Sequence, residues 1–315
     1  MRDDVAVSFE DFGYWVRALM TPTEYNSRRQ SLSSLPYSER QMIMVTEDEV
    51  VDALYQVEFE EQDHDDHHDH DNQYVRLALD IIKNSARALS PLSVVLEKLI
   101  FEAIDAWKRA REDGIPIRMV GKSEASKLTF PPGHPRNKVM YIAHPAIPDL
   151  YYTTANFHRV VFEHKFSEAI RLLMHLGANQ LRVEHICGWS KEFSSRLSVP
   201  LEHTSVALDA NMDSSSNSQI QLLYEAMLCG TKEPEIPDSL VWYPHEPTWQ
   251  TIAEGRLRFG LRQFSLNVNY EDDYGINAGL KASAIKAKLD LGGNFEDHEI
   301  TIWRIAGRFC EDDLN

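Results

Sequence analysis

The sequence is poor in cysteine and lacks the patterns that mark the commonest nucleotide, metal and nucleophile sites. Its 315 residues include three cysteines, at positions 187, 229 and 310, and none has the CxxC spacing of a zinc knuckle or a redox pair. The sequence contains no GxxxxGK[ST] motif, no GxGxxG after a predicted strand and no GxSxG elbow. A nucleotide-dependent enzyme and a serine hydrolase of the common kind therefore have no support.

Long apolar runs are also missing. No stretch approaches the run of about 18 apolar residues that a membrane-spanning helix needs, so we expect no transmembrane segment. The N-terminal residues MRDDVAVSFEDF contain no apolar signal-peptide core. Together with the scattered cysteines, this predicts a cytoplasmic protein in a reducing compartment.

Positive charge is scarce: 32 Lys and Arg stand against 49 Asp and Glu, which gives a net charge of −17. This balance argues against general binding of nucleic acid, because phosphate contacts need clustered basic residues. Residues 46–73 hold twelve acids and no Lys or Arg, whereas residues 76–138 carry twelve bases and seven acids. The acidic window is either a solvated loop or a surface that contacts the basic middle of its own chain or a basic partner.

Within this window, residues 61–73 form an acidic, histidine-rich tract that is too polar to contribute to a core, and we expect a mobile loop. Imidazole and carboxylate groups are ligands for Zn²⁺, Ni²⁺ or Cu²⁺, and the tract offers four histidines, namely His64, His67, His68 and His70. A polar tract does not fix the geometry of its ligands, so the simplest interpretation is a solvated loop without a specific metal site.

The apolar pattern predicts an α+β fold with a helical N-terminal half, a central helix–strand unit and a C-terminal antiparallel β-meander. In the N-terminal half, we expect helices over 9–20, 73–88 and 90–113. A further helix should begin at Thr46, which forms a capping box with Glu49. In the central part, the expected elements are a strand at 138–143, a helix over 156–176, a strand over 181–186 and a helix over 217–230.

From about residue 249 the apolar pattern changes to a period of two, which is typical of strands. The pattern predicts strands within 257–261, 264–270, 276–291 and 300–309, although residues 281–291 also have the Ala and Lys content of a helix. The predicted domains are a helical segment at 1–60, the loop at 61–73, and an α+β domain at 74–315 with its antiparallel sheet at about 249–310.

Two groups of residues are candidates for binding. Arg256, Arg258 and Arg262 alternate with apolar residues, so they would share one face of the predicted C-terminal sheet. Tyr151 and Tyr152 lie in a proline-rich segment that leads into the helix over 156–176, and we predict that this segment is a binding loop.

The predicted helix over 156–176 also carries His158, His164 and Glu168, with His164 and Glu168 one turn apart. A His/Glu pair at this spacing either ligates a metal or exchanges protons, and with His144 nearby it gives the alternative of a metal-dependent hydrolase. The HExxH motif is absent, and an exposed i, i+4 pair is the simpler interpretation.

These observations favour a non-enzymatic binding protein that contacts a partner protein or a lipid-like ligand through the amphipathic sheet and the Tyr151–Tyr152 loop. No cofactor is predicted, and a divalent metal enters only with the hydrolase alternative or with the histidine-rich loop. A further alternative is a membrane-active protein that oligomerises into a pore, because long amphipathic hairpins line bilayer pores in some proteins. A homo-oligomer is compatible with the first and the last of these hypotheses.

Overall fold

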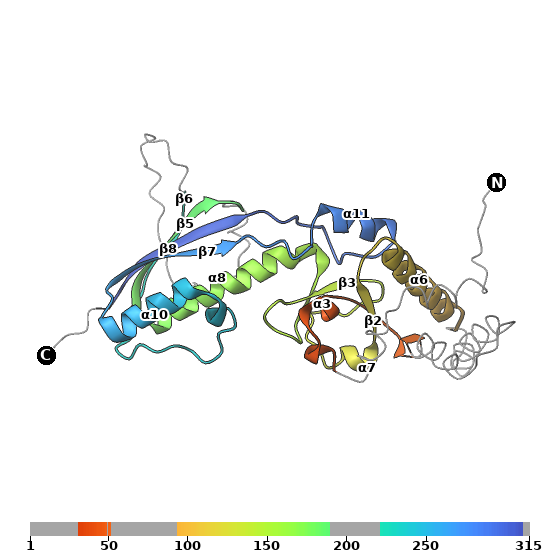
Figure 1. The fold of residues 1–315 in the computed structure, drawn as a ribbon, viewed down its shortest axis with the longest axis horizontal. Coiled ribbons are helices and arrows are strands. Elements are labelled where there is room, and N and C mark those ends of the chain that lie inside the picture. Colours follow the sequence, from red (N-terminus) through yellow and green to blue (C-terminus); the bar gives the residue numbers. More distant parts are fainter. Residues whose placement is uncertain (1–30, 49, 52–92, 190–220, 311–315) are drawn as a thin grey trace. The chain divides into compact units, whose positions relative to one another are not determined.

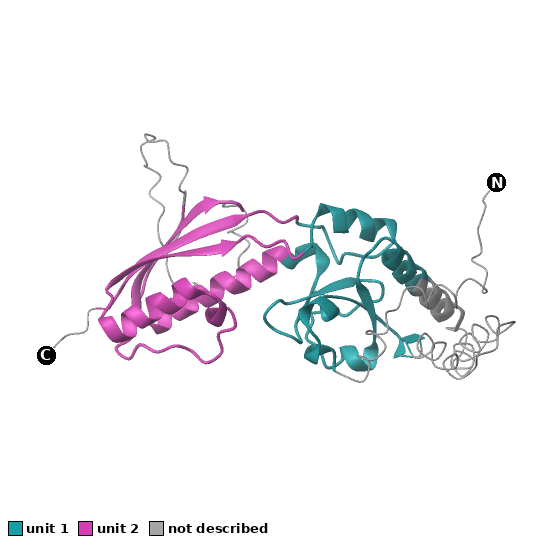
Figure 2. Ribbon diagram, viewed as in Figure 1, with its two compact units in different colours: residues 1–157, 275–296 teal, residues 158–274, 297–315 magenta. Residues whose placement is uncertain are grey.

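A computed structural model of the protein describes residues 31–48, 50–51, 93–189 and 221–310 (Figure 1). The chain divides into two compact units (Figure 2): unit 1 is made of residues 1–157 and 275–296, and unit 2 of residues 158–274 and 297–315. The predicted α+β class is confirmed, because each unit combines helices with a four-stranded sheet. The boundaries predicted near residues 60 and 73 lie outside the described residues and stay predictions.

The sheet of unit 1 has the strand order β2-β1-β3-β4, in which β1 is Met42–Thr46, β2 is Ile117–Gly121, β3 is Met140–Ala143 and β4 is Tyr151–Thr153. Strand β2 runs parallel to β1, whereas β3 and β4 join antiparallel to their neighbours. The other elements of unit 1 are helices and short 3-10 turns: η1 (Leu32–Ser34), α3 (Tyr37–Arg40), α6 (Ser93–Glu112), α7 (Lys122–Ala125), η3 (Thr154–Asn156) and α11 (Ala278–Lys286).

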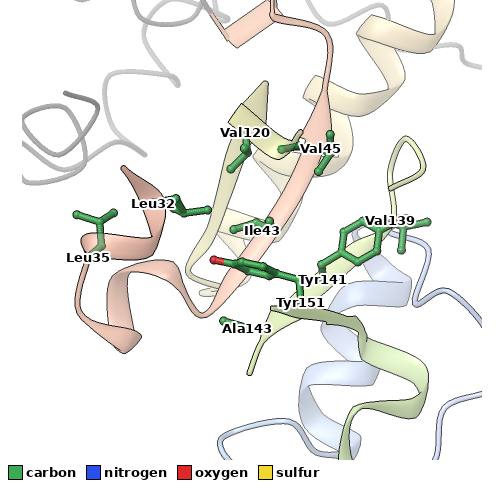
Figure 3. Packing of buried hydrophobic residues seen from close by; sticks show 10 residues of the cluster. Leu32, Leu35, Ile43, Val45, Val120, Val139, Tyr141, Ala143 and Tyr151 are labelled. Carbon is green, nitrogen blue, oxygen red and sulfur yellow. The ribbon is translucent and has the colours of Figure 1, made fainter. Parts of the chain in front are cut away.

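Apolar side chains from this sheet and from the segment that precedes it form the core of unit 1 (Figure 3): Leu32, Leu35, Ile43, Val45, Val120, Ala125, Val139, Tyr141, Ala143 and Tyr151. The buried tyrosine hydroxyls have partners, as burial requires. Tyr151 Oη donates to the carbonyl of Arg40 at 2.9 Å, and Tyr141 Oη lies 2.6 Å from His134 Nδ1.

The sheet of unit 2 has the order β6-β5-β8-β7, with each strand antiparallel to its neighbours. Strand β5 is Ala178–Cys187, β6 is Gln221–Met227, β7 is Gln263–Tyr270 and β8 is Thr301–Phe309. Helices α8 (Phe157–His175) and α10 (Pro247–Phe259) lie on one side of this sheet, and the turn η4 (Tyr243–His245) precedes α10 (Figure 2). The apolar stripe predicted for α8 is buried: Phe162, Phe166, Ala169, Leu173 and Leu176.

Among the described residues of the N-terminal half, a strand lies next to the predicted capping box. Residues 42–46 form strand β1, and Thr46 is the last residue of that strand rather than a helix cap. The next helical residue is Asp48, so the predicted capping box with Thr46 as N-cap is wrong. A short apolar run such as that of β1 is compatible with a buried strand and with a buried helix. Residues 42–46 form a strand because they pair with β2 and β3. The helix expected over 9–20 lies outside the described residues.

Three predictions for the second half of the chain are wrong. Residues 257–259 are the end of helix α10, which buries Trp249, Ile252, Ala253 and Arg256 at helical spacing. Gly260, with φ 63°, caps the helix. Much of 276–291 forms helix α11, whose N-cap Asn277 accepts hydrogen bonds from the N–H groups of Gly279 and Leu280. The helix expected over 217–230 is strand β6, which pairs with β5.

The predicted strands over 138–143, 181–186, 264–270 and 300–309 correspond to β3, β5, β7 and β8, and the predicted helices over 90–113 and 156–176 to α6 and α8. No helix in the described part of the chain is long and apolar enough to cross a membrane.

Candidate functional site

The three arginines assigned to one sheet face are not on a sheet. Arg256 and Arg258 belong to helix α10, and Arg262 precedes strand β7. Arg256 is buried, donates from Nε to the carbonyl of Leu176 at 3.2 Å and stacks over the ring of Phe309. Arg258 is exposed and pairs with Glu254 at 3.0 Å, one helical turn away. Arg256 therefore stabilises the packing of α10, and only Arg258 and Arg262 remain at the surface.

Tyr151 and Tyr152 belong to strand β4 rather than to a loop, so the predicted loop is wrong, while binding by these residues stays a prediction. The side chain of Tyr151 is completely buried in the core of unit 1 (Figure 3). Its hydroxyl donates to the backbone carbonyl of Arg40. Tyr152 is half-buried, and its ring lies 6.0 Å from that of His144. His144 is itself buried, with Nδ1 accepting from the N–H groups of Ala146 and Ile147 at 3.0 Å each.

Glu168 and His164 of α8 hold the segment before helix α10. The buried carboxylate of Glu168 accepts three backbone hydrogen bonds, from Val241, Trp242 and Tyr243, at 2.8, 2.7 and 2.9 Å. His164 Nδ1 accepts the indole N–H of Trp242 at 3.0 Å, and burial lowers the pKa of this imidazole. A neutral imidazole that accepts a hydrogen bond, beside a carboxylate with three donors, has the properties of a structural anchor.

His158 belongs to a different set of contacts in unit 2. It is completely buried, and its Nδ1 lies 2.8 Å from Tyr270 Oη on β7. The ring of His298 lies 5.1 Å from the ring of His158, and Tyr274 packs against Tyr270 with a pKa that burial raises to about 12. The residues of the hydrolase hypothesis are thus divided: His144 lies in unit 1, His158 contacts Tyr270, and His164 and Glu168 contact residues 241–243.

The metal hypothesis for His64, His67, His68 and His70 falls outside the described residues. Within the ranges that the structure describes, no group of three or more His, Cys, Asp or Glu side chains is arranged to hold a metal ion.

The outer face of the unit 2 sheet, opposite α8 and α10, is polar. In β7 the exposed residues alternate strictly with buried ones; the exposed set is Gln263, Ser265, Asn267 and Asn269. On the neighbouring strands, Glu184 bridges Arg182 at 2.9 Å and Arg304 at 3.6 Å. One carboxylate on this face thus pairs with two arginines.

The edge of β7 offers backbone hydrogen-bonding groups that have no backbone partner among the described residues. Phe309 N–H donates to the carbonyl of Arg262 at 2.9 Å, so residues 262 and 309 form a hydrogen-bonded pair. In an antiparallel ladder such pairs alternate, and the register then directs the backbone groups of residues 264, 266, 268 and 270 toward β8. Those of residues 263, 265, 267 and 269 point away from β8.

One outward group is already used, which supports this assignment: the carbonyl of Asn269 accepts from Lys165 Nζ at 2.8 Å. No described residue makes a backbone hydrogen bond to the N–H or C=O groups of Gln263, Ser265 or Asn267. We name these six groups the free edge of β7. The sequence signal for this edge is the uninterrupted alternation from Phe264 to Tyr270, but no sequence pattern identifies which strand is at the edge of a sheet.

Comparisons with known proteins add no assignment, because no family model, no curated protein and no solved structure matches this chain.

Proposed function

We propose that the protein is a non-enzymatic interaction protein that binds polypeptide partners by strand addition to the free edge of β7. The observation that carries the proposal is the row of exposed backbone donors and acceptors at Gln263, Ser265 and Asn267, which have no partner among the described residues. An extended segment that pairs with such an edge gains main-chain hydrogen bonds over its whole length.

The strand lacks the devices by which proteins normally protect an edge. Natural edge strands carry proline, lysine or other charges, or contain β-bulges that twist the edge away. Strand β7, with the sequence QFSLNVNY, has no charged residue and no proline, and its register with β8 is continuous over eight residue pairs. By contrast, the register between β5 and β8 shifts twice. The absence of protection favours an edge that is used for pairing.

A photoreactive amino acid in place of Asn267 tests this proposal in cells that express the full chain. We expect covalent products in which mass spectrometry identifies an extended peptide joined near residue 267. The same photoreactive residue at Glu254, which is exposed on α10, serves as the position control.

A proline at the edge provides the decisive comparison. The N–H of Ser265 points away from β8, so Ser265→Pro removes one edge donor without removing a bond within the sheet. Ser265→Pro should abolish the products and Ser265→Ala should retain them, with unchanged circular dichroism in both. Products that persist in the proline variant, or none at Asn267, would overturn the proposal.

A lipid surface is a second candidate, favoured by a separate observation. Phe259, at the end of α10, is 78% exposed, and Leu257 is also exposed. Arg258 and Arg262 lie beside them in the chain, and exposed apolar and cationic groups together suit an anionic bilayer surface. Flotation with phosphatidylserine vesicles, compared for the unchanged chain and Phe259→Ser, tests this candidate; equal flotation of both would overturn it.

A further inference from the structure

We propose that the strand added to β7 is β7 of a second copy of the chain, so that two sheets join antiparallel into a two-fold symmetric dimer. This inference rests on the proposed function, because it names the partner of the same edge. A two-fold interface uses the same surface twice, so that surface must complement itself in backbone groups, side chains and charge.

The backbone groups of the free edge are self-complementary. Antiparallel strands exchange both hydrogen bonds between directly opposite residues of alternate pairs. A two-fold axis at Leu266 places Ser265 of one copy opposite Asn267 of the other, and both residues direct their N–H and C=O groups outward. Gln263 then lies opposite Asn269, whose carbonyl is held by Lys165, so the added ladder ends there.

The side chains match in the same register. Leu266, the residue at the axis, points to the helix-covered face of the sheet and is buried within its own copy, so no polar side chain of β7 lies at the axis on that face. On the outer face, only neutral side chains meet, since Ser265, Asn267, Gln263 and Asn269 carry no charge. The joined strands therefore neither bury a charge nor place like charges opposite each other. In protected edge strands, lysines create such charge contacts and so discourage pairing.

Charge decides the direction of pairing. Strand β7 has Arg262 immediately before it and the exposed acids Glu271 and Asp272 immediately after it. Antiparallel pairing about Leu266 brings Arg262 of one copy opposite Tyr270 of the other, and therefore beside Glu271 of the other, twice by symmetry. Parallel pairing would instead bring Arg262 beside Arg262 and Glu271 beside Glu271, which is unfavourable.

The other edge strand, β6, carries no comparable argument. It follows residues 190–220, which lie outside the described residues, and its register with β5 shifts between Val183 and Glu184.

The test is sedimentation equilibrium of the purified full chain over a range of concentrations. The same measurement is made on variants in which the charges of Arg262 and Glu271 are reversed singly and together. The unchanged chain should reach the mass of a dimer. Arg262→Glu and Glu271→Arg should each weaken the dimer by about ten-fold or more, because each introduces two like-charge contacts. The double variant R262E/E271R restores opposite charges and should recover the original dimer constant to within about three-fold.

Two controls separate the possible outcomes. Ser265→Pro should leave a folded monomer, and Ser265→Ala a dimer. A chain that is monomeric at all concentrations, or a double variant no better than the single ones, would overturn the second copy as partner. If photo-crosslinking at position 267 nevertheless gives products with another polypeptide, and Ser265→Pro abolishes them, the strand-addition proposal survives without the dimer. If crosslinking gives no products, the strand-addition proposal and the dimer proposal are both wrong.

Discussion

At the scale of single residues, the buried polar side chains of unit 2 anchor chain segments. Glu168 shows this most clearly, because one carboxylate satisfies three consecutive N–H groups where the chain turns toward α10. Carboxylates with this many backbone donors are stabilising, and their removal leaves the donors without partners. Sequence spacing placed His164 and Glu168 on one helix correctly but could not identify residues 241–243 as their partners.

Replacement of Glu168 by alanine should lower the free energy of unfolding by about 3 kcal/mol, because buried backbone donors lose a charged acceptor. Urea unfolding of the purified protein measures this change. Glu254→Ala, which removes an exposed partner of Arg258, is the matched control and should cost less than about 0.5 kcal/mol. A similar loss in both variants would contradict the role assigned to Glu168.

The imidazole of His164 should make stability depend on pH. Burial lowers its pKa in the folded protein below the ordinary value of 6.5, so the unfolded chain takes up a proton first as the pH falls. Stability is therefore complete above pH 6.5 and declines from there down through the folded-state pKa. His134 has a lowered pKa as well and acts in the same direction.

His164→Gln isolates the contribution of His164, because an amide oxygen also accepts the Trp242 indole N–H but does not titrate. Unfolding measured at pH 7.5 and pH 5.5 should show a smaller loss of stability on acidification in His164→Gln than in the unchanged protein. An equal loss in the two proteins would mean that His164 does not titrate as described.

At the scale of elements, the sequence pattern identified the long buried helix α8 and strands β5, β7 and β8, because their apolar residues recur at one clear period. It failed where two periods fit equally well. Residues 256–261 alternate like a strand, yet Trp249, Ile252, Ala253 and Arg256 are spaced like a helix and are buried. An edge strand and a free edge could not be predicted, because strand order depends on pairing between distant segments.

The stability of helix α11 depends on its N-cap residue, Asn277. The helix contains nine residues and lies where the alternation favoured a strand. The side chain of Asn277 caps it by accepting two N–H groups, and Asn277→Ala should lower the free energy of unfolding by about 1 kcal/mol. Asn294→Ala, at an exposed position outside any helix or strand, is the control for a general effect of losing an asparagine. Equal stability of the two variants in urea would contradict the capping role.

At the scale of the whole molecule, the function hypotheses divide between unit 2 and the acidic tract. The tract at 61–73 carries four histidines among aspartates, so we expect zinc or nickel retained by the full chain to depend on this tract. Deletion of residues 61–73 should therefore reduce zinc or nickel retained after dialysis to background, as measured by plasma mass spectrometry. A stoichiometric ion in the deletion variant that is lost in His164→Ala would revive the hydrolase hypothesis.

Amide hydrogen exchange at the edge of β7 tests most directly whether this edge pairs with another strand. The N–H groups of Leu266 and Val268 are bonded to β8, whereas those of Ser265 and Asn267 face outward. We predict that exchange at Ser265 and Asn267 slows by about ten-fold or more as the protein concentration is raised until the dimer forms. In Ser265→Pro, which should stay a monomer, exchange at Asn267 should not slow. Rapid exchange of these two amides at every concentration would contradict the account.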